Sequence, residues 1–301
     1  MITLARFILK GYSQAALVAA AMAMLGLILP PFAWISGAAI ALITLVGGHR
    51  QGILVPAIAA IGTAVFAGII ISAPEFAAWF VLLIWLPVLM LAVVLRNTVS
   101  LVLCIQLLAG VSLLGIVILY QFFPDLGEFW RPSLEMMASE MLVQSEDALD
   151  EAQLQQVIDN VIRILPGFLA SSFMIGTLLS LYLARWWQAT IYNPGGFGKE
   201  FRALNLGKTT ALVAMAIALV ATLVEGQALA DTFYAMMLVV FMLYLNQGLA
   251  VLHAVIAGKQ LNAVWLYLVY ILMFFIPHIV VLLAMAGLAD TWIDFRRRLV
   301  A

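Results

Sequence analysis

The chain has 301 residues, of which 66% are hydrophobic and only 10% are charged, and its mean hydropathy is +1.14. Soluble domains carry about 25% charged and about 45–50% apolar residues, so a soluble globular protein, a disordered chain and a nucleic-acid-binding protein are all excluded. The net charge is −1, and the single cysteine, Cys104, excludes a disulfide framework and a cysteine metal site. The composition is that of a polytopic membrane protein.

Nine apolar segments alternate with short breaks in which charged residues, Pro and Gly gather. A membrane-spanning helix needs about 20 apolar residues, and strand-like alternation is absent, so we expect an all-α bundle of eight or nine transmembrane helices. The first segment is expected to be a retained helix rather than a cleaved signal peptide, because the chain stays apolar after Pro30-Pro31. The second is short and could be tilted or re-entrant. The segments are 12–29, 32–47, 53–72, 77–95, 99–122, 164–184, 210–229, 233–257 and 262–288.

The short loops carry their Lys and Arg residues on alternate sides of these segments. The positive-inside rule then predicts a multi-pass protein of the bacterial inner (cytoplasmic) membrane with a cytoplasmic N-terminus. Nine full spans would place the basic run 296–298 outside, against the rule, so either one segment is re-entrant or the last run breaks at Pro277 and turns back. The residues on the cytoplasmic side would be Arg6, Lys10, Arg50, Arg96, Arg185, Lys199, Arg202, Lys208 and Lys259.

A long acidic segment, 123–163, separates an N-terminal five-helix membrane part (1–122) from a C-terminal membrane part (164–301). It holds nine acidic residues and has apolar positions at helical spacing. This pattern predicts an acidic amphipathic helical hairpin outside the membrane, its first helix starting at Pro132 with Ser133 as N-cap. The ordered ligand spacing of a calcium loop is missing, so metal binding is not predicted.

A second long segment, 185–209, is expected to be a basic-aromatic cytoplasmic loop. Asn193-Pro194-Gly195-Gly196 indicates a turn, while neither common phosphate-loop spacing is met. Basic and aromatic residues beside a membrane favour the headgroup zone, although contact with a cytoplasmic protein is an alternative. The candidate lipid or partner contacts are the basic Lys199, Arg202 and Lys208 and the interfacial Trp186, Trp187 and Phe197.

Polar residues inside the spans are the candidates for a lined cavity. Asn246 and His253 fall on one helical face, and Gln106 and His278 could join them; the alternative is that each makes an ordinary interhelical hydrogen bond. The three histidines are widely separated, and no intramembrane carboxylate pair or HExxH motif occurs. We therefore predict no catalytic residues, no metal and no cofactor, and that the protein is not an enzyme.

In the first segment, Ala15, Ala19 and Ala23 form a stripe of small side chains at four-residue spacing. Such a stripe permits close helix packing, either within the bundle or as a docking face for another protein.

The stretches SQAALVAAAMAMLGLILP and ALITLVGGHRQGILVPAIAAI resemble the opening of the membrane S-components of energy-coupling-factor transporters, with Gly48 and Gly52 matching the turn of that family. Most of the chain is similar to the YybS-like polytopic membrane proteins, through PGGFGKEFR and the closing GLADTWIDFRRR. The resemblance implies an S-component-like subunit for uptake of a small, vitamin-like molecule, with the alanine stripe docking on a coupling subunit that works with an ATPase pair. It supplies no ligand-binding residues. The alternative is a non-transport scaffold or assembly factor that acts on other membrane proteins through its two long loops. Membrane lipids are expected partners, and nucleic acid is not.

Overall fold

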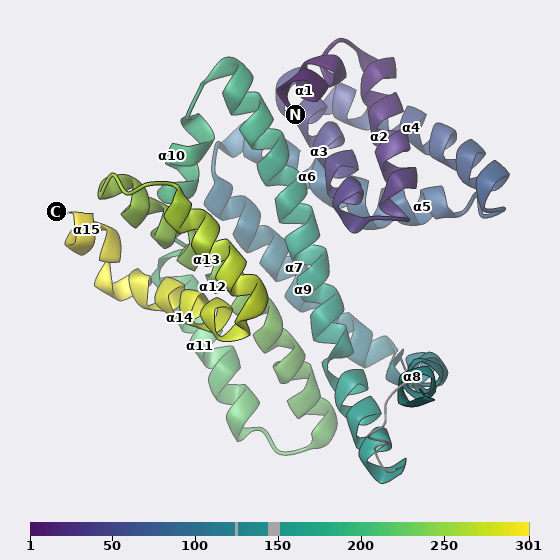
Figure 1. Cartoon of the computed structure of the whole chain (residues 1–301), viewed down its shortest axis with the longest axis vertical. Helices are drawn as coiled ribbons and strands as arrows, with labels where there is room; N and C mark the ends of the chain where they lie inside the picture. The colour runs from purple at the N-terminus through teal and green to yellow at the C-terminus, as the bar shows by residue number, and fades with distance from the viewer. Residues whose placement is uncertain (124–125, 144–150, 301) are drawn as a thin grey trace.

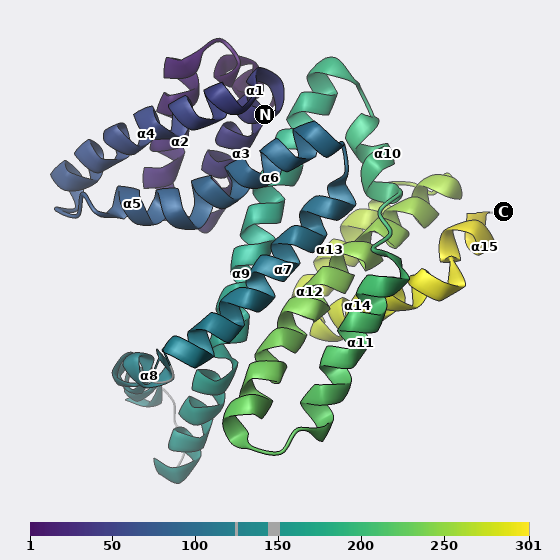
Figure 2. The same ribbon diagram turned by 180° about the vertical axis from the view of Figure 1, so that it is seen from behind.

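The computed structural model describes residues 1–123, 126–143 and 151–300, and all regular secondary structure in these ranges is helical, which confirms the all-α prediction (Figures 1 and 2). The helices, with η1 a π-helical turn, are α1 (Ile2–Ile8), α2 (Tyr12–Gly26), α3 (Pro30–Gly47), α4 (His49–Ile70), α5 (Phe76–Phe80), η1 (Val81–Trp85), α6 (Leu86–Thr98), α7 (Leu101–Phe122), α8 (Leu126–Val143), α9 (Glu151–Tyr192), α10 (Gly196–Arg202), α11 (Gly207–Leu223), α12 (Gln227–Gly258), α13 (Val264–Phe275), α14 (Pro277–Ile293) and α15 (Phe295–Val300).

Helix α3 is the centre of the N-terminal half, where α2, α4, α6 and α9 pack around it. Every residue from Ser36 to Leu45 is buried. Small residues allow the close approach: a Cβ atom on Gly37 would lie 2.7 Å from Ser180 Oγ of α9. The Trp85 indole donates to Ser36 Oγ (2.9 Å), and the Ser36 hydroxyl donates to the Ala19 carbonyl (2.7 Å). These two bonds join η1, α3 and α2 inside the apolar core.

Helix α9 is 42 residues long and runs between the N-terminal and C-terminal halves of the molecule (Figure 1). It continues through both boundaries expected from the sequence, at 163/164 and 184/185. Pro166 and Gly167 lie inside it without ending it, because Gly167 packs directly on the backbone of Ala235 in α12. Neighbouring helices commonly compensate for such residues in membrane proteins.

Helix α8 and the first turns of α9 form the expected helical pair. The predicted start at Pro132 with Ser133 as N-cap is wrong, because α8 begins at Leu126 and contains Pro132. The Arg131 guanidinium bonds Glu128 on its own helix (2.6 Å) and Asp159 on α9 (2.7 Å), which ties the two helices together. The hydrogen bond from Arg131 lowers the pKa of Glu128. The connection at 144–150 lies outside the described residues.

The last apolar segment is not one span. It breaks at Ile276-Pro277 into α13 and α14, which are bent by 119° from each other, so the predicted break at Pro277 is confirmed. Helix α14 folds back from α13 and packs along α12, so α13 and α14 form a hairpin (Figure 1). Proline ends α13 because it cannot donate the next helical hydrogen bond and restricts the residue before it.

Among the described residues, six helices are long and apolar enough to cross a membrane, and there are up to eight if each bent pair counts as one span. The six are α3, α4, the continuous helical unit 76–98, α7, α9 and α12, and the pairs are α10 with α11 and α13 with α14. The segment expected at 12–29 forms only the 15-residue helix α2. At 1.5 Å per residue this is about 22 Å, which is shorter than a typical hydrocarbon core.

One end of the bundle gathers most basic residues. Arg96 donates to the Val46 carbonyl at the end of α3 (3.0 Å), and Arg185 pairs with Glu200 of α10. Arg296 donates to the Arg202 carbonyl at the end of α10 (2.8 Å). The basic C-terminal helix α15 therefore lies at the same end as the 185–209 segment, as a hairpin at 264–293 requires.

Candidate functional site

A cavity of about 840 Å³ lies between the α2–α3 turn, α5 with η1, the second half of α7 and the middle of α9. We call it the apolar cavity. Ligand sites for small molecules typically measure about 300–1,000 Å³. The cavity lies toward the end of the bundle opposite the basic residues, because it begins at Gly26 and Pro30, whereas Arg50 follows the other end of α3 and Arg96 lies in the last turn of α6.

Its walls are aromatic and aliphatic with few polar groups. Trp34, Trp79 and Phe173 supply large rings. Ser112 is 3% exposed, and its hydroxyl has no hydrogen-bond partner within the described part of the chain. A buried polar group without a partner costs about 1–3 kcal/mol, but this hydroxyl oxygen lies beneath the cavity wall and does not face the open space. The chemistry of the wall fits a largely apolar molecule.

Missing side chains create part of this space. Gly115 lines the cavity from α7, and a Cβ atom there would meet no heavy atom of the described chain within 4 Å. Gly176 lines it from α9, where a Cβ atom would lie 3.2 Å from the Trp34 indole nitrogen. A larger residue at position 115 would therefore enter the cavity without displacing a neighbour.

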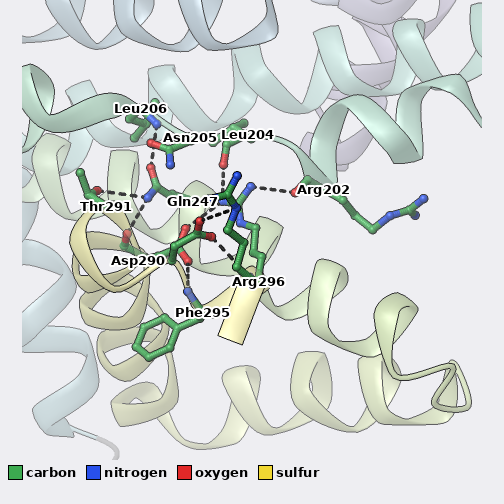
Figure 3. Close-up of polar contacts among 12 residues, drawn as sticks. Arg202, Leu204, Asn205, Leu206, Gln247, Asp290, Thr291, Phe295 and Arg296 are labelled. Atoms are coloured by element: carbon green, nitrogen blue, oxygen red, sulfur yellow. Dashed lines mark hydrogen bonds and ion pairs between the residues drawn. The ribbon is translucent and has the colours of Figure 1, made fainter. Parts of the chain in front are cut away.

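A separate polar network surrounds the linker 203–206 between α10 and α11 (Figure 3). Gln247 of α12 is fully buried; its carbonyl oxygen accepts from the Leu206 N–H (2.9 Å), and its amide donates to the Gly287 carbonyl (2.7 Å). Gln106 of α7 donates to the Leu206 carbonyl (2.9 Å) and to the Thr210 hydroxyl (2.8 Å). Side chains from different helices thus satisfy the backbone of an irregular segment inside the bundle.

The same network contains a buried ion pair. Asp290 at the end of α14 is 1% exposed, and its carboxylate lies 3.1 Å from the Arg296 guanidinium. The other carboxylate oxygen accepts from the Phe295 N–H (2.9 Å). Arg296 also donates to the Leu204 carbonyl, so the pair joins α14 and α15 to the linker. The pair therefore acts as a structural clamp.

The four predicted cavity residues do not come together in one site. Gln106 donates a hydrogen bond to the backbone of the linker 203–206. Asn246 accepts from the Tyr182 hydroxyl (3.0 Å), and His253 shares a hydrogen bond with Tyr270 (2.9 Å). His278 is exposed at the start of α14, in the turn of the hairpin. None of the four lines the apolar cavity, although His253 lines a smaller aromatic pocket at the basic end.

Ala15, Ala19 and Ala23 are each 0% exposed, because α2 packs against α3 and α4. Of the two alternatives left open by the sequence, this placement favours packing within the chain. A docking role would need these side chains to be accessible.

The 185–209 segment is more ordered than a loop, with the end of α9, a turn, α10 and the linker in succession. Lys199 and Lys208 are exposed, and Trp186 is 39% exposed, as lipid contact requires. Trp187 departs from its predicted interfacial place: it is 0% exposed because the next position along α9 points about 100° further around the helix, into the core. Among the described residues, no group of three or more His, Cys, Asp or Glu could hold a metal ion.

Sequence reasoning did not single out Ser112 or Asp290, and it considered Arg296 only as part of the basic run 296–298 that bears on topology. A lone serine in an apolar helix gives no signal of what it faces. Asp290 could have been suspected, because a carboxylate inside an apolar run needs a partner and the nearest cations follow within eight residues.

Membrane-length helices with broad exposed apolar faces define a polytopic integral membrane protein. The chain belongs to the family described as "Predicted membrane protein (DUF2232)", whose model matches residues 17–291. The match covers the apolar cavity and the linker network up to Asp290, but not Phe295 and Arg296. No curated protein and no solved structure matches the chain.

Proposed function

We propose that the protein is a membrane-embedded binding subunit, similar to an S-component, that captures a small, largely apolar molecule for uptake. The observation that carries this proposal is the apolar cavity of about 840 Å³. Its size suits a vitamin-like molecule, and its wall is almost entirely apolar. A separate coupling subunit with an ATPase pair would drive release, and no catalytic chemistry is assigned to this chain.

The orientation follows from charge. We infer that the basic end faces the cytoplasm of a bacterial cell, with the N-terminus on that side. The position of Arg296 beside Arg202 supports this, since it brings the C-terminal arginines to the end that holds the other cations. The apolar cavity would then lie in the outer half of the membrane, where a substrate from outside arrives.

The cavity-filling substitution Gly115→Leu tests the proposal. Protein purified from native membranes in mild detergent is extracted with organic solvent, and the extract is analysed by mass spectrometry. We expect a small apolar molecule with the unmodified protein, and its loss from Gly115→Leu. Gly110→Leu is the matched control, because it lies on the same helix, faces no heavy atom of the described chain within 4 Å and does not line the cavity. Equal amounts of ligand in both variants would contradict the assignment.

Uptake needs partners, so the same preparations are analysed for co-purifying proteins. A coupling subunit and ATPase pair would support transport. A retained ligand without either would restrict the function to binding.

The second candidate is a scaffold or assembly factor. The α8–α9 pair favours it, since Arg131 holds the two helices together and Phe129 is 73% exposed on this acidic surface. Photo-crosslinking from position 129 to another membrane protein, in a preparation that holds no ligand, would favour this function over uptake.

A further inference from the structure

A second pocket, of about 410 Å³, lies at the basic end between the end of α9, α10, α12 and α13. We call it the aromatic pocket. Its walls include Tyr182, Phe197, Phe201, Arg202, His253 and Tyr270. It shares only α9 with the apolar cavity, and no residue lines both.

The aromatic rings form a continuous wall. Tyr182 and Phe201 have ring centroids 5.6 Å apart, and Phe201 and His253 are 5.5 Å apart, both edge to face. His253 continues to Tyr270 through their hydrogen bond of 2.9 Å. The wall therefore fixes α10, α12 and α13 around the pocket.

Arg202 is the cation of this pocket. Its guanidinium makes no hydrogen bond or ion pair within the described ranges, in contrast to Arg185, which is paired with Glu200. The Arg202 carbonyl is held by Arg296, and Figure 3 shows the side chain extending away from the linker network. The backbone at this position is thus fixed while the charge remains free for a ligand.

Helix α13 continues from the pocket as an apolar surface. None of its 12 residues is buried, and they include the exposed Ile271 and Phe274. At 1.5 Å per residue, the helix is about 18 Å long, roughly half of a 30 Å hydrocarbon core. It starts near Lys259 at the basic end and turns at Pro277, so its length matches one leaflet.

We propose that the aromatic pocket binds one anionic phospholipid of the leaflet at the basic end. Its phosphate pairs with the Arg202 guanidinium between the aromatic walls, and its acyl chains lie along α13. This goes beyond a basic surface near headgroups, because it assigns a single site with a defined cation and a surface for the chains. It is independent of the proposed uptake function, which concerns the other cavity.

Native mass spectrometry of the full chain in detergent tests the site by titration with phosphatidylglycerol or phosphatidylcholine. The key variant is Arg202→Gln, which removes the charge but keeps the backbone carbonyl that Arg296 binds. Lys208→Gln is the control, since it makes the same change in net charge at an exposed position outside the pocket. Thermal melting of both variants establishes that they are folded.

We expect the unmodified protein and Lys208→Gln each to retain one phosphatidylglycerol. The affinity of Arg202→Gln for this lipid should fall by about tenfold or more, as the loss of a charge-assisted hydrogen bond implies. Phosphatidylcholine should not be retained. Equal binding by Arg202→Gln, or an equal loss in both variants, would overturn the proposal. Glycerol 3-phosphate binding as tightly as phosphatidylglycerol would show a site for soluble phosphate esters instead. A co-purifying protein that is lost in Arg202→Gln, without any bound lipid, would assign the pocket to a protein partner.

Discussion

Three buried or half-buried polar side chains bond the backbone of one irregular segment. Gln106, Gln247 and Arg296 come from separate helices, and each bonds the backbone of the linker 203–206 or of the residue before it. No water is available inside a bilayer to satisfy irregular backbone, so these side chains replace it. The linker can therefore lie among the helices.

Gln247→Leu should destabilise the protein by about 1–3 kcal/mol, because the buried Leu206 N–H would lose its acceptor. The measurement is the unfolding midpoint in detergent. His278→Leu is the control, at an exposed position in the hairpin turn, and should leave the midpoint unchanged. Equal effects of the two changes would refute a specific role for Gln247.

The adjacent Arg296 and Arg297 allow the effect of a buried ion pair on stability to be compared with that of an exposed one. Arg296→Gln removes the partner of the buried Asp290, and breaking a buried pair in this way typically costs about 3–5 kcal/mol. Arg297 is 89% exposed and faces Asp294 on the surface, so Arg297→Gln should change the free energy of unfolding by less than about 1 kcal/mol. Chemical unfolding of both variants measures the difference. A smaller effect at 296 than at 297 would contradict the clamp.

At the level of elements, the most extensive helix packing is between α12 and α14, and two glycines make it possible. A Cβ atom on Gly287 would lie 2.2 Å from the Tyr244 carbonyl oxygen, and one on Gly248 would lie 1.9 Å from the Leu283 carbonyl oxygen. Because the obstacles are backbone atoms, no side chain can move aside. The hairpin at 264–293 depends on this crossing.

Gly287→Ala should therefore force the two helices apart and destabilise the protein by about 1–3 kcal/mol, as overpacking does. Gly110→Ala, with open space around its Cβ position in the described chain, should be neutral or slightly stabilising. Thermal unfolding in the same detergent compares them. If Gly287→Ala has the same melting temperature as the unmodified protein, α12 and α14 do not cross as closely as described.

Much of this element structure follows from the sequence, since apolar runs bounded by Pro, Gly and charge locate α3, α4, α7, α11 and α12, and Pro277 marks the broken segment. The continuity of α9 through Pro166-Gly167 did not follow, because it depends on packing against Ala235, a contact between residues far apart in the chain. The length of α2 was overestimated because the high hydropathy continues through the turn at residues 27–29, where the backbone leaves the helix.

The candidate site was harder to predict for a related reason. Helical periodicity identified the face of Asn246 and His253 but not the neighbouring Gln247, which is the fully buried one. Likewise, periodicity found the stripe of Ala15, Ala19 and Ala23 but cannot say which helix covers it. A cavity is defined by the side chains that are absent, such as at Gly115, and a single sequence does not reveal which glycines face the same space.

At the scale of the whole molecule, the α13–α14 hairpin predicts that the two ends of the segment 264–293 lie on the same side of the membrane. Cysteines at Lys259 and Arg298 should react with an impermeant thiol reagent from the same side, which we expect to be the cytoplasm, while a cysteine at Asn160 should react from the opposite side. The background is Cys104→Ala, and labelling is compared in intact and permeabilised cells. Opposite labelling of positions 259 and 298 would mean that the segment 264–293 crosses the membrane completely.

Helix α9 has one more consequence. Its 42 residues extend about 63 Å, which exceeds a bilayer with both headgroup regions, about 40–45 Å thick. The same uninterrupted rod carries Asp159 in the α8–α9 pair, Phe173 in the apolar cavity and Tyr182 in the aromatic pocket. If a protein bound to the projecting end of α9 and tilted the helix, the wall that α9 contributes to each of the two pockets would move with it. Contact at the membrane surface and occupancy of the cavity would then be mechanically linked.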